Sequence, residues 1–278
     1  MWTQKNRPRY NRDHLRYPSN LTDEEWAVIE PLIPPPRPGG GKRRTDMRAV
    51  VNGLMYILST GCQWRALPKD FPPRGTVYNY FVWWRCDHVL DLIHHALYVE
   101  CRERAERGAS PTAAIIDSQS VKGAEKGGPT LIRTALTPGK LIKGKKRHIL
   151  VDTLGLLLHA IVHAANVQDR DGGLLLLATL FGKFPFLQKL LADSSYQGPI
   201  FAHGLVKILP YLKTEIIKRS DHAKGFVRLP KRWIVERTIA WLNRCRRLAK
   251  DWENLNCSGL AFLKLASIRL MMRKLCNP

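Results

Sequence analysis

Two short apolar runs, each followed by an aspartate, constrain the fold of this chain most strongly. They are AAIID, which ends at Asp117, and KLLAD, which ends at Asp193. Runs of this length fit buried strands. If the two strands are parallel neighbours, both carboxylates lie at the edge of the sheet where open α/β folds bind their ligands. A single aspartate at such a position is more often a turn former or a helix cap, so the pair carries the functional interpretation.

The pattern around these runs predicts a mixed α/β sheet with flanking helices. Apolar runs at 148–151 and 156–165 read as a hairpin that turns at Thr153-Leu154-Gly155. A third run covers 187–192. We expect another strand at 215–218 and helices at 174–180, 200–209, 232–250 and 260–275, with Asp169 or Asp171 as the cap of the first of these helices. This order suits a sheet whose first three strands are antiparallel and whose later strands are parallel.

The first third of the chain has a different pattern. Residues 1–20 are polar and basic, which predicts a disordered arm, and residues 21–105 predict a small helical domain. Thr22 and Glu25 form a capping box ahead of the first helix. A Pro/Gly-rich linker at 34–44 precedes a second helix, which Gly61 closes. The α/β pattern begins at 111 and continues to 278, so we expect a second domain over 111–278.

The charge balance favours a polyanionic partner. Forty-five Lys and Arg against 23 Asp and Glu give a net charge of +22, and nucleic acid is the leading candidate. A ribosomal or chromatin protein would fit this charge equally well. The six cysteines form no CxxC pair, and no apolar run of the length that spans a membrane occurs. We therefore expect a cytoplasmic protein without a membrane segment, and the absence of glycine-rich phosphate-binding motifs implies no nucleotide cofactor.

Glu236 is the only acidic residue between 228 and 250, a stretch rich in Arg and Lys. One interpretation is a surface salt bridge with Arg232, one helical turn earlier. The other is that Glu236 joins Asp117 and Asp193 around a metal, since gathered carboxylates repel one another unless a cation lies between them. Hard oxygen ligands of this kind predict Mg²⁺ or Mn²⁺.

Several longer motifs together resemble one enzyme family. They are LTDEEWAVIEPLIP, IIDSQSV, KGKKRHILVDTLGLLLHAIVHAANVQDRDG, LADSSYQG and LPKRWIVERTIAWLNRCRRLAKDWE. In content and order they resemble the bacterial insertion-sequence transposases of the "insertion sequence five" group, from about residue 20 to 255. The resemblance implies an RNase H-like core with a mixed five-stranded sheet. It also implies a catalytic triad of Asp117, Asp193 and Glu236 that holds two Mg²⁺ or Mn²⁺ ions.

The same resemblance implies a partner and a reaction. The partner would be double-stranded DNA, both the terminal inverted repeats of the element, read by the helical domain, and the target. The reaction would be cleavage at the element ends and joining of the 3′ ends to target DNA by at least a homodimer. Two alternatives stay open: an RNase H-like nuclease without strand transfer, and a non-catalytic DNA-binding regulator.

The motif around Glu236 departs from the family pattern in two places. Arg232 matches the family's arginine, but Leu229 stands where the family has tyrosine and Asn243 where it has lysine. Arg244 or Arg247 can replace that lysine, and segment 129–140 is also atypical. The cations expected to contact DNA phosphate are Lys143, Lys145, Lys146, Arg147, Arg232, Arg237, Arg244 and Arg247. A solvated loop is the alternative for Lys143 to Arg147.

Overall fold

The computed structural model describes residues 4, 10–36, 39, 42–123, 135–136, 143–180, 182–217 and 231–277. The chain forms two compact units. We call the first the helical unit; it comprises Met1–Leu97, Arg244–Leu248 and Ala261–Pro278. The second, the sheet unit, comprises Tyr98–Asn243 and Ala249–Leu260. The division expected at 105–111 therefore differs from the observed one, because the end of the chain groups with the beginning.

The helical unit begins with elements whose ends the sequence dictates. Thr22 and Glu25 form the expected capping box at the start of α2. Asp46 caps α3, and Gly61 ends α3 in the left-handed conformation at φ 70°, which glycine adopts without steric cost. The elements of the unit are α2 (Asp23–Ile29), η1 (Glu30–Leu32), α3 (Met47–Thr60), η2 (Trp64–Ala66), α4 (Arg74–Cys86), α5 (Val89–Glu103) and α10 (Asn256–Cys276).

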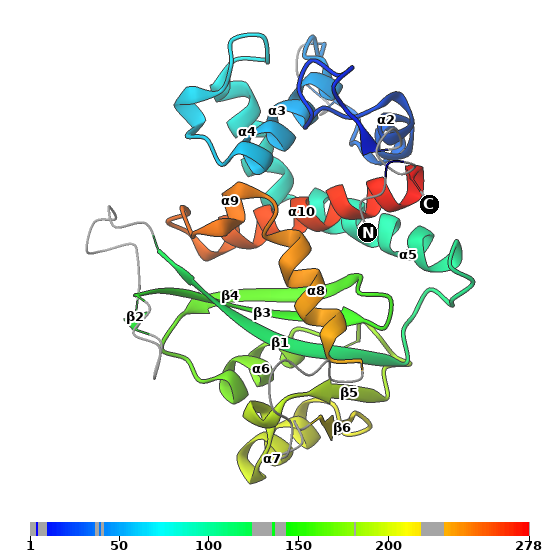
Figure 1. The fold of residues 1–278 in the computed structure, drawn as a ribbon, viewed down its shortest axis with the longest axis vertical. Helices are drawn as coiled ribbons and strands as arrows, with labels where there is room; N and C mark the ends of the chain where they lie inside the picture. The colour runs from blue at the N-terminus through cyan, green and yellow to red at the C-terminus, as the bar shows by residue number, and fades with distance from the viewer. Residues whose placement is uncertain are drawn as a thin grey trace. The chain divides into compact units, whose positions relative to one another are not determined.

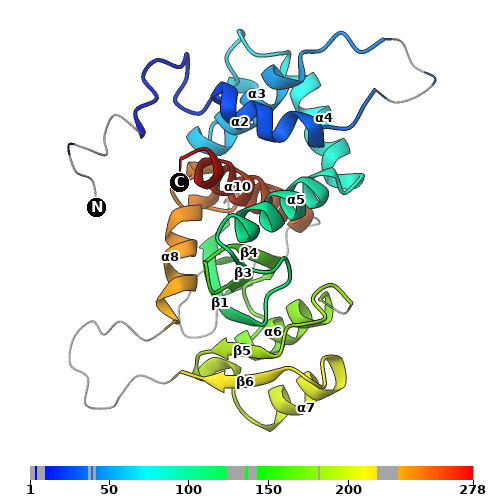
Figure 2. The ribbon, with the colours of Figure 1, turned by 90° about the vertical axis from the view of Figure 1, so that its right-hand side faces the viewer.

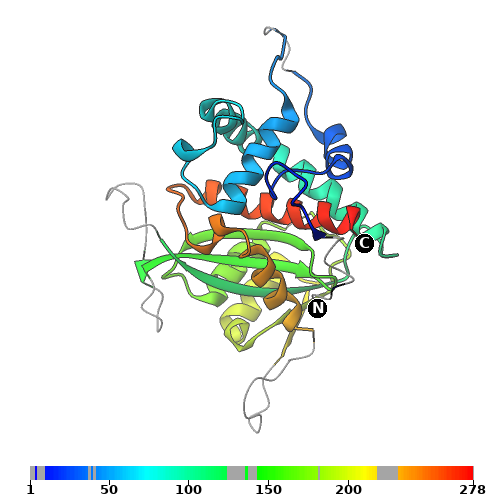
Figure 3. The same ribbon diagram turned by 45° about the horizontal axis from the view of Figure 1, so that its top comes forward.

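Helix α10 completes the core of the helical unit (Figure 3). Phe262 stacks on Phe81 of α4 with ring centroids 4.6 Å apart. Ser267 hydrogen-bonds the ring of His94 at 3.0 Å, and Lys264 pairs with Asp91. Because these contacts join residues far apart in sequence, the pattern of residues 21–105 alone could not show that their core needs a further helix.

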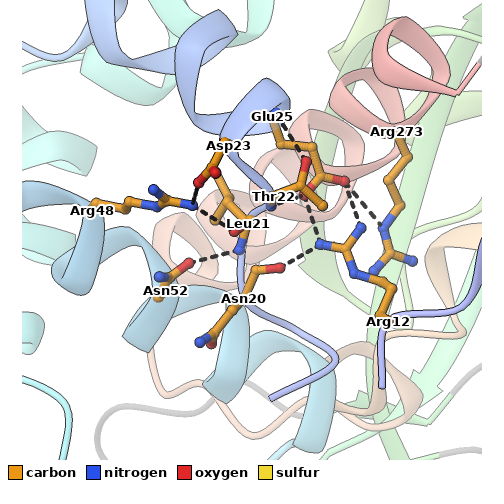
Figure 4. A network of polar contacts seen from close by, with 9 residues as sticks. All are labelled: Arg12, Asn20, Leu21, Thr22, Asp23, Glu25, Arg48, Asn52 and Arg273. Carbon is orange, nitrogen blue, oxygen red and sulfur yellow. Dashed lines mark hydrogen bonds and ion pairs between the residues drawn. The ribbon is translucent and has the colours of Figure 1, made fainter. Parts of the chain in front are cut away.

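The segment before α2 is also built into the helical unit. Both Arg12 Nη atoms donate to the carboxylate of Glu25 at 2.7 Å, and Arg273 of α10 approaches the same carboxylate at 4.0 Å (Figure 4). Tyr17 stacks on Phe71 with centroids 5.1 Å apart. For residues 10–20 the expectation of a disordered arm is therefore wrong: a charge-neutralising partner, Glu25, is buried at their docking point.

The sheet unit has the predicted mixed sheet (Figure 1). Its strand order is β2-β3-β1-β5-β6, with β4 paired to β3. β1 pairs antiparallel with β3, and β3 with β4, whereas β5 is parallel to β1 and to β6. The strands are β1 (Ala113–Lys122), β2 (Ala135–Leu136), β3 (Lys143–Asp152), β4 (Leu157–Ala164), β5 (Lys189–Ala192) and β6 (Lys213–Ile216). The two-residue β2 was not predicted.

Helices cover both faces of this sheet. α8 (Trp233–Leu242) lies on one face, and α6 (Asp169–Ala178) lies on the other, next to α7 (Pro199–Ile208) (Figure 2). The short η3 (Ser194–Tyr196) follows β5, and α9 (Arg246–Ala249) follows α8. Side chains of β1 and β3 such as Ile115, Ile149 and Val151 are fully buried between these layers.

The hairpin between β3 and β4 turns where the sequence predicts. Asp152 Oδ1 accepts hydrogen bonds from the backbone N–H groups of Leu154 and Leu156, both at 2.9 Å. Gly155 has φ 82°, and a β-carbon there would lie 2.9 Å from the Thr238 hydroxyl. The other oxygen of Asp152 accepts from Arg102 at 2.5 Å. A buried ion pair between Arg102 and Asp152 thus fixes the turn within the sheet unit.

Two helix predictions need correction. Neither Asp169 nor Asp171 caps α6; both lie in its first turn, and Gln168 is the N-cap residue without a side-chain bond. The helix expected over 232–250 is interrupted, because α8 ends at Leu242 with Asn243 as its C-cap. Asparagine is a poor helix former that commonly ends helices.

Candidate active site

Asp117 and Asp193 lie on neighbouring parallel strands, as expected. The parallel pairing of β1 with β5 runs from Ala113–Lys189 to Ile115–Leu191, and Asp117 and Asp193 follow just beyond it. Asp193 leaves the sheet directly after β5 and accepts a hydrogen bond from the Ser195 N–H at 2.8 Å. Asp117 does not end its strand, however. β1 continues to Lys122 because its other edge stays paired to β3.

Glu236 comes to the same place from the other layer. It lies in the first turn of α8, which packs on β1 and β3. Arg232, one turn earlier, contacts two acids: its Nη2 is 3.2 Å from Asp193 Oδ2, and its Nε is 3.6 Å from Glu236 Oε1. Arg232 therefore joins Asp193, which follows β5, to Glu236 of α8, and its charge also acts on Asp117 of β1.

Burial and like charge act on Asp117 together. They raise the pKa of its carboxyl to about 6, with burial as the larger cause and the charges of Asp193 and Glu236 adding to it. The Ser118 N–H, which donates to Asp117 Oδ1 at 2.7 Å, and Arg232 act in the opposite direction. A raised carboxyl pKa beside two further acids is characteristic of functional sites.

The donor set fits a divalent cation by its chemistry. All three side chains offer carboxylate oxygens, the ligands that Mg²⁺ and Mn²⁺ prefer. Within the ranges that the structure describes, no three acid, histidine or cysteine side chains are close enough to hold a metal ion together. Asp193 and Glu236 are instead joined through Arg232, which supplies the positive charge between them.

A buried polar layer lies behind Asp117, and sequence reasoning did not assign it to the site. Ser118 donates to Asp169 Oδ1 at 2.6 Å, and Lys146 pairs with the same oxygen at 3.0 Å. Tyr196 is 1% exposed and its hydroxyl lies 3.2 Å from His148 Nδ1. Burial, then the nearby charge of Asp117, raises the pKa of this phenol. The sequence offered one signal for these residues: Ser118 comes directly after Asp117, and Tyr196 comes three residues after Asp193.

The basic cluster before the hairpin proves to be part of β3, and its side chains are buried. Lys145 pairs with Asp251 at 2.7 Å, and Lys146 pairs with Asp169. Arg147 is 2% exposed. All three side chains are buried in this structure, so neither phosphate contact nor a solvated loop describes them here, and acids of the sheet unit pair with Lys145 and Lys146. The side chain of Lys143 lies outside the described residues.

The remaining cations differ in exposure. Arg237 lies between the rings of Trp233 and Trp241, 4.5 and 4.6 Å from their centroids, and donates to the Leu154 carbonyl at 3.3 Å. Arg244 is exposed. Arg247 is buried in the helical unit and donates to the Cys62 carbonyl at 3.0 Å, so its side chain is not placed to replace the family lysine.

Two of the sequence departures lie partly or wholly outside the described residues. Leu229 belongs to 218–230, and most of the atypical segment 129–140 is likewise not described. Asn243 is described and serves as the C-cap of α8. Its position at the end of the helix explains why the chain turns there.

Comparison with known proteins finds similarity to transposases and insertion elements. Residues 21–94 match a family described as putative transposase of the IS4/5 family. An uncharacterized 16.2 kDa protein of insertion element IS402 from Burkholderia cepacia is 31% identical over 116 residues, which are 38% of this chain and 76% of that protein. A putative transposase for IS402 from the same organism is 33% identical over 135 residues, which are 44% of this chain and 60% of that protein. No solved structure matches the chain.

The second family match covers the candidate site itself. Residues 108–271 match the transposase DDE domain, a range that includes Asp117, Asp193 and Glu236. In the described parts of the chain, no helix is long and apolar enough to cross a bilayer. Since this match spans more than half of the 278 residues, the chain belongs to the DDE transposases of the IS4/IS5 family.

Proposed function

We propose that this protein binds the terminal inverted repeats of an insertion sequence, cleaves DNA at the element ends and joins the 3′ ends to target DNA. The observation that carries the proposal is that the charges of Asp193, Glu236 and Arg232 all act on Asp117, while Arg232 pairs with both Asp193 and Glu236. A structural role would explain one acid beside one arginine. It gives no reason for three acids, one of them with a raised pKa.

The three carboxylates would hold two Mg²⁺ or Mn²⁺ ions. Such ions activate the attacking water or 3′-hydroxyl and stabilise the departing oxygen of a phosphodiester. The chain's own part is to supply ionised carboxylates at fixed positions. The strands β1 and β5 fix Asp117 and Asp193, and the packing of α8 on the sheet fixes Glu236. Because the pKa of Asp117 is about 6, more than half of its carboxyl groups are ionised only above that pH in the metal-free protein.

DNA binding would rest on the positive charge that is not neutralised internally. The net charge is +22, and such charge gives affinity for phosphate that falls steeply with salt. Arg244 is exposed and stays a proposed phosphate contact, as do Arg232 and Arg237 near Glu236. We assign recognition of the inverted repeats to the helical unit, and pairing of two ends implies at least two copies of the chain.

The test is Glu236→Gln, which keeps the size of the side chain and removes its charge. Folding and DNA binding should be retained, because Glu236 is half exposed and loss of an acid makes the surface more positive. Cleavage of end-containing DNA in Mg²⁺ should fall by orders of magnitude, as loss of catalytic charge typically causes. Gel assays of cleavage, strand transfer and binding on the same samples measure all three.

Glu215→Gln is the matched control, since Glu215 is an exposed acid on β6 whose partner is Lys189. It should cut as the wild type does. Equal cleavage by Glu236→Gln and wild type would remove Glu236 from the triad. Wild-type cleavage without any strand-transfer product would favour the nuclease. Absence of any metal-dependent cleavage by the wild type would favour the regulator.

A further inference from the structure

Arg232 is the cation that Asp193 and Glu236 share. Its Nη2 lies 3.2 Å from Asp193 Oδ2, and its Nε lies 3.6 Å from Glu236 Oε1. Its charge also acts on Asp117, whose pKa it lowers against the larger effect of burial. A guanidinium can do this because its donors point in separate fixed directions, so two carboxylates bind without sharing a nitrogen.

The place of Arg232 in the fold makes this arrangement reversible. It is the N-cap residue of α8, its side chain makes no capping hydrogen bond, and that side chain is 24% exposed. The side chain is mostly covered, but part of it is open to solvent. Its two carboxylate partners are themselves 20% and 47% exposed, so solvent reaches the contacts from outside.

We propose that Arg232 is the internal counter-cation of the metal-free triad and competes with divalent metal for the oxygens of Asp193 and Glu236. The inference rests on the proposed function, because it takes these acids as the metal ligands. It reverses the simpler idea that Arg232 only orients Glu236. An orienting arginine would help metal to bind, whereas a competing arginine must give up its ion pairs first.

The two readings predict opposite signs for one measurement. We expect Arg232→Gln to bind Mn²⁺ on the order of tenfold more tightly than the wild type in titration calorimetry without DNA, since two part-exposed ion pairs no longer have to be broken. Without metal, in a chelator, the variant should melt at a lower temperature than the wild type, because the acids lose their only shared cation among the described residues. Added Mn²⁺ should then raise its melting temperature by more.

Arg232→Lys and Lys207→Gln complete the test. A lysine keeps the charge but offers a single point of contact, so we expect an affinity between those of wild type and Arg232→Gln. Lys207→Gln removes one exposed charge from α7 and should leave Mn²⁺ affinity unchanged. Unchanged or weaker Mn²⁺ binding by Arg232→Gln would overturn the inference.

Asp193→Asn separates failure of this inference from failure of the proposed function. If the triad holds metal, Asp193→Asn weakens Mn²⁺ binding whatever Arg232 does. If Asp193→Asn binds Mn²⁺ weakly and Arg232→Gln binds it no more tightly than the wild type, the counter-cation role is wrong but the metal site stands. Wild-type affinity in Asp193→Asn and Glu236→Gln alike would overturn the metal site, and the inference with it.

Discussion

At the scale of single residues, Asp117 combines two demands that oppose each other. Asp117 is paired to β3 on one edge of β1 and only partly exposed, and burial disfavours a charged carboxylate. Binding a cation requires that same charge. The protein therefore carries an ionised group at a place where folding alone would favour a neutral one, which is common where function and stability conflict.

This conflict makes the effect of pH on stability predictable. The pKa of Asp117 is raised from 3.8 to about 6 on folding, so the unfolded chain loses this proton first and the folded state becomes less stable as pH rises between these values. Asp117→Asn has no such charge. In a chelator it should melt at a higher temperature than the wild type at about pH 8, and the gain should vanish below about pH 4.

Thermal melts of both proteins across that pH range measure the effect, with Glu215→Gln as the control. The pKa of exposed Glu215 is lowered, chiefly by Lys189, so its replacement should give no gain at high pH. An Asp117→Asn variant that is no more stable than wild type at high pH would show that the carboxylate is not strained by burial.

The three acids were predictable from sequence, whereas their surroundings were not. Asp117 and Asp193 follow apolar runs, and Glu236 stands alone among cations, so each leaves a local signal. Tyr196 and Ser118 leave almost none, because what matters is which partners the sheet places beside them. The position of Arg232 between two acids depends on β5 and α8 meeting, a tertiary contact that spacing cannot show.

At the scale of elements, β3 shows how a strand can carry charge into a core. Its basic residues alternate between the two faces of the sheet, as side chains of a strand do. Lys145 then meets Asp251 on one face, and Lys146 meets Asp169 on the other. Phosphate contact and its alternative, a solvated loop, both assumed exposed side chains, since buried lysines are rare without a partner. The partners lie far away in sequence, which is why the prediction failed.

Removing one member of such a pair should be costly. Lys145 and Asp251 are 2% and 3% exposed, so Asp251→Ala leaves a buried ammonium unpaired and should lower the free energy of unfolding by about 3–5 kcal/mol. Adding Lys145→Met to Asp251→Ala should recover much of this loss. Urea denaturation of the single and double variants gives both values.

The double variant also tests the corrected role of Lys145. Provided that it folds, its affinity for DNA at fixed salt should equal that of the wild type, because Lys145 offers no charge to the surface. A marked loss of affinity would mean that β3 opens on binding and that Lys145 reaches phosphate after all. A single variant Asp251→Ala as stable as wild type would contradict the buried pair itself.

At the scale of the whole molecule, the helical unit needs a helix from the far end of the chain. Phe262 stacks on Phe81 and approaches Trp64, and Arg273 approaches Glu25. A fragment that ends at residue 105 lacks these partners, and its apolar faces would stay in water. We therefore expect this fragment to show helical circular dichroism but no cooperative thermal transition.

Joining residues 256–278 to that fragment through a flexible linker should restore a cooperative transition and, with it, any preference for end DNA. Phe262→Ala in the joined fragment should weaken the transition again. A cooperative melt of the shorter fragment would show that α10 is dispensable for the core of the helical unit.

The division of the helical unit between the two ends of the chain has a consequence for synthesis. A ribosome that has completed Leu97 must still translate the sheet unit before it reaches α10. At bacterial or eukaryotic elongation speeds this takes roughly ten to thirty seconds. During that time the apolar faces of the nascent α3, α4 and α5 stay exposed, because the helix that covers them has not been made. We expect chaperones to bind these exposed faces. Chains cut short by a nonsense mutation within the sheet unit would lack that helix too, so we expect such fragments neither to fold at their N-terminal end nor to compete with full-length copies for DNA.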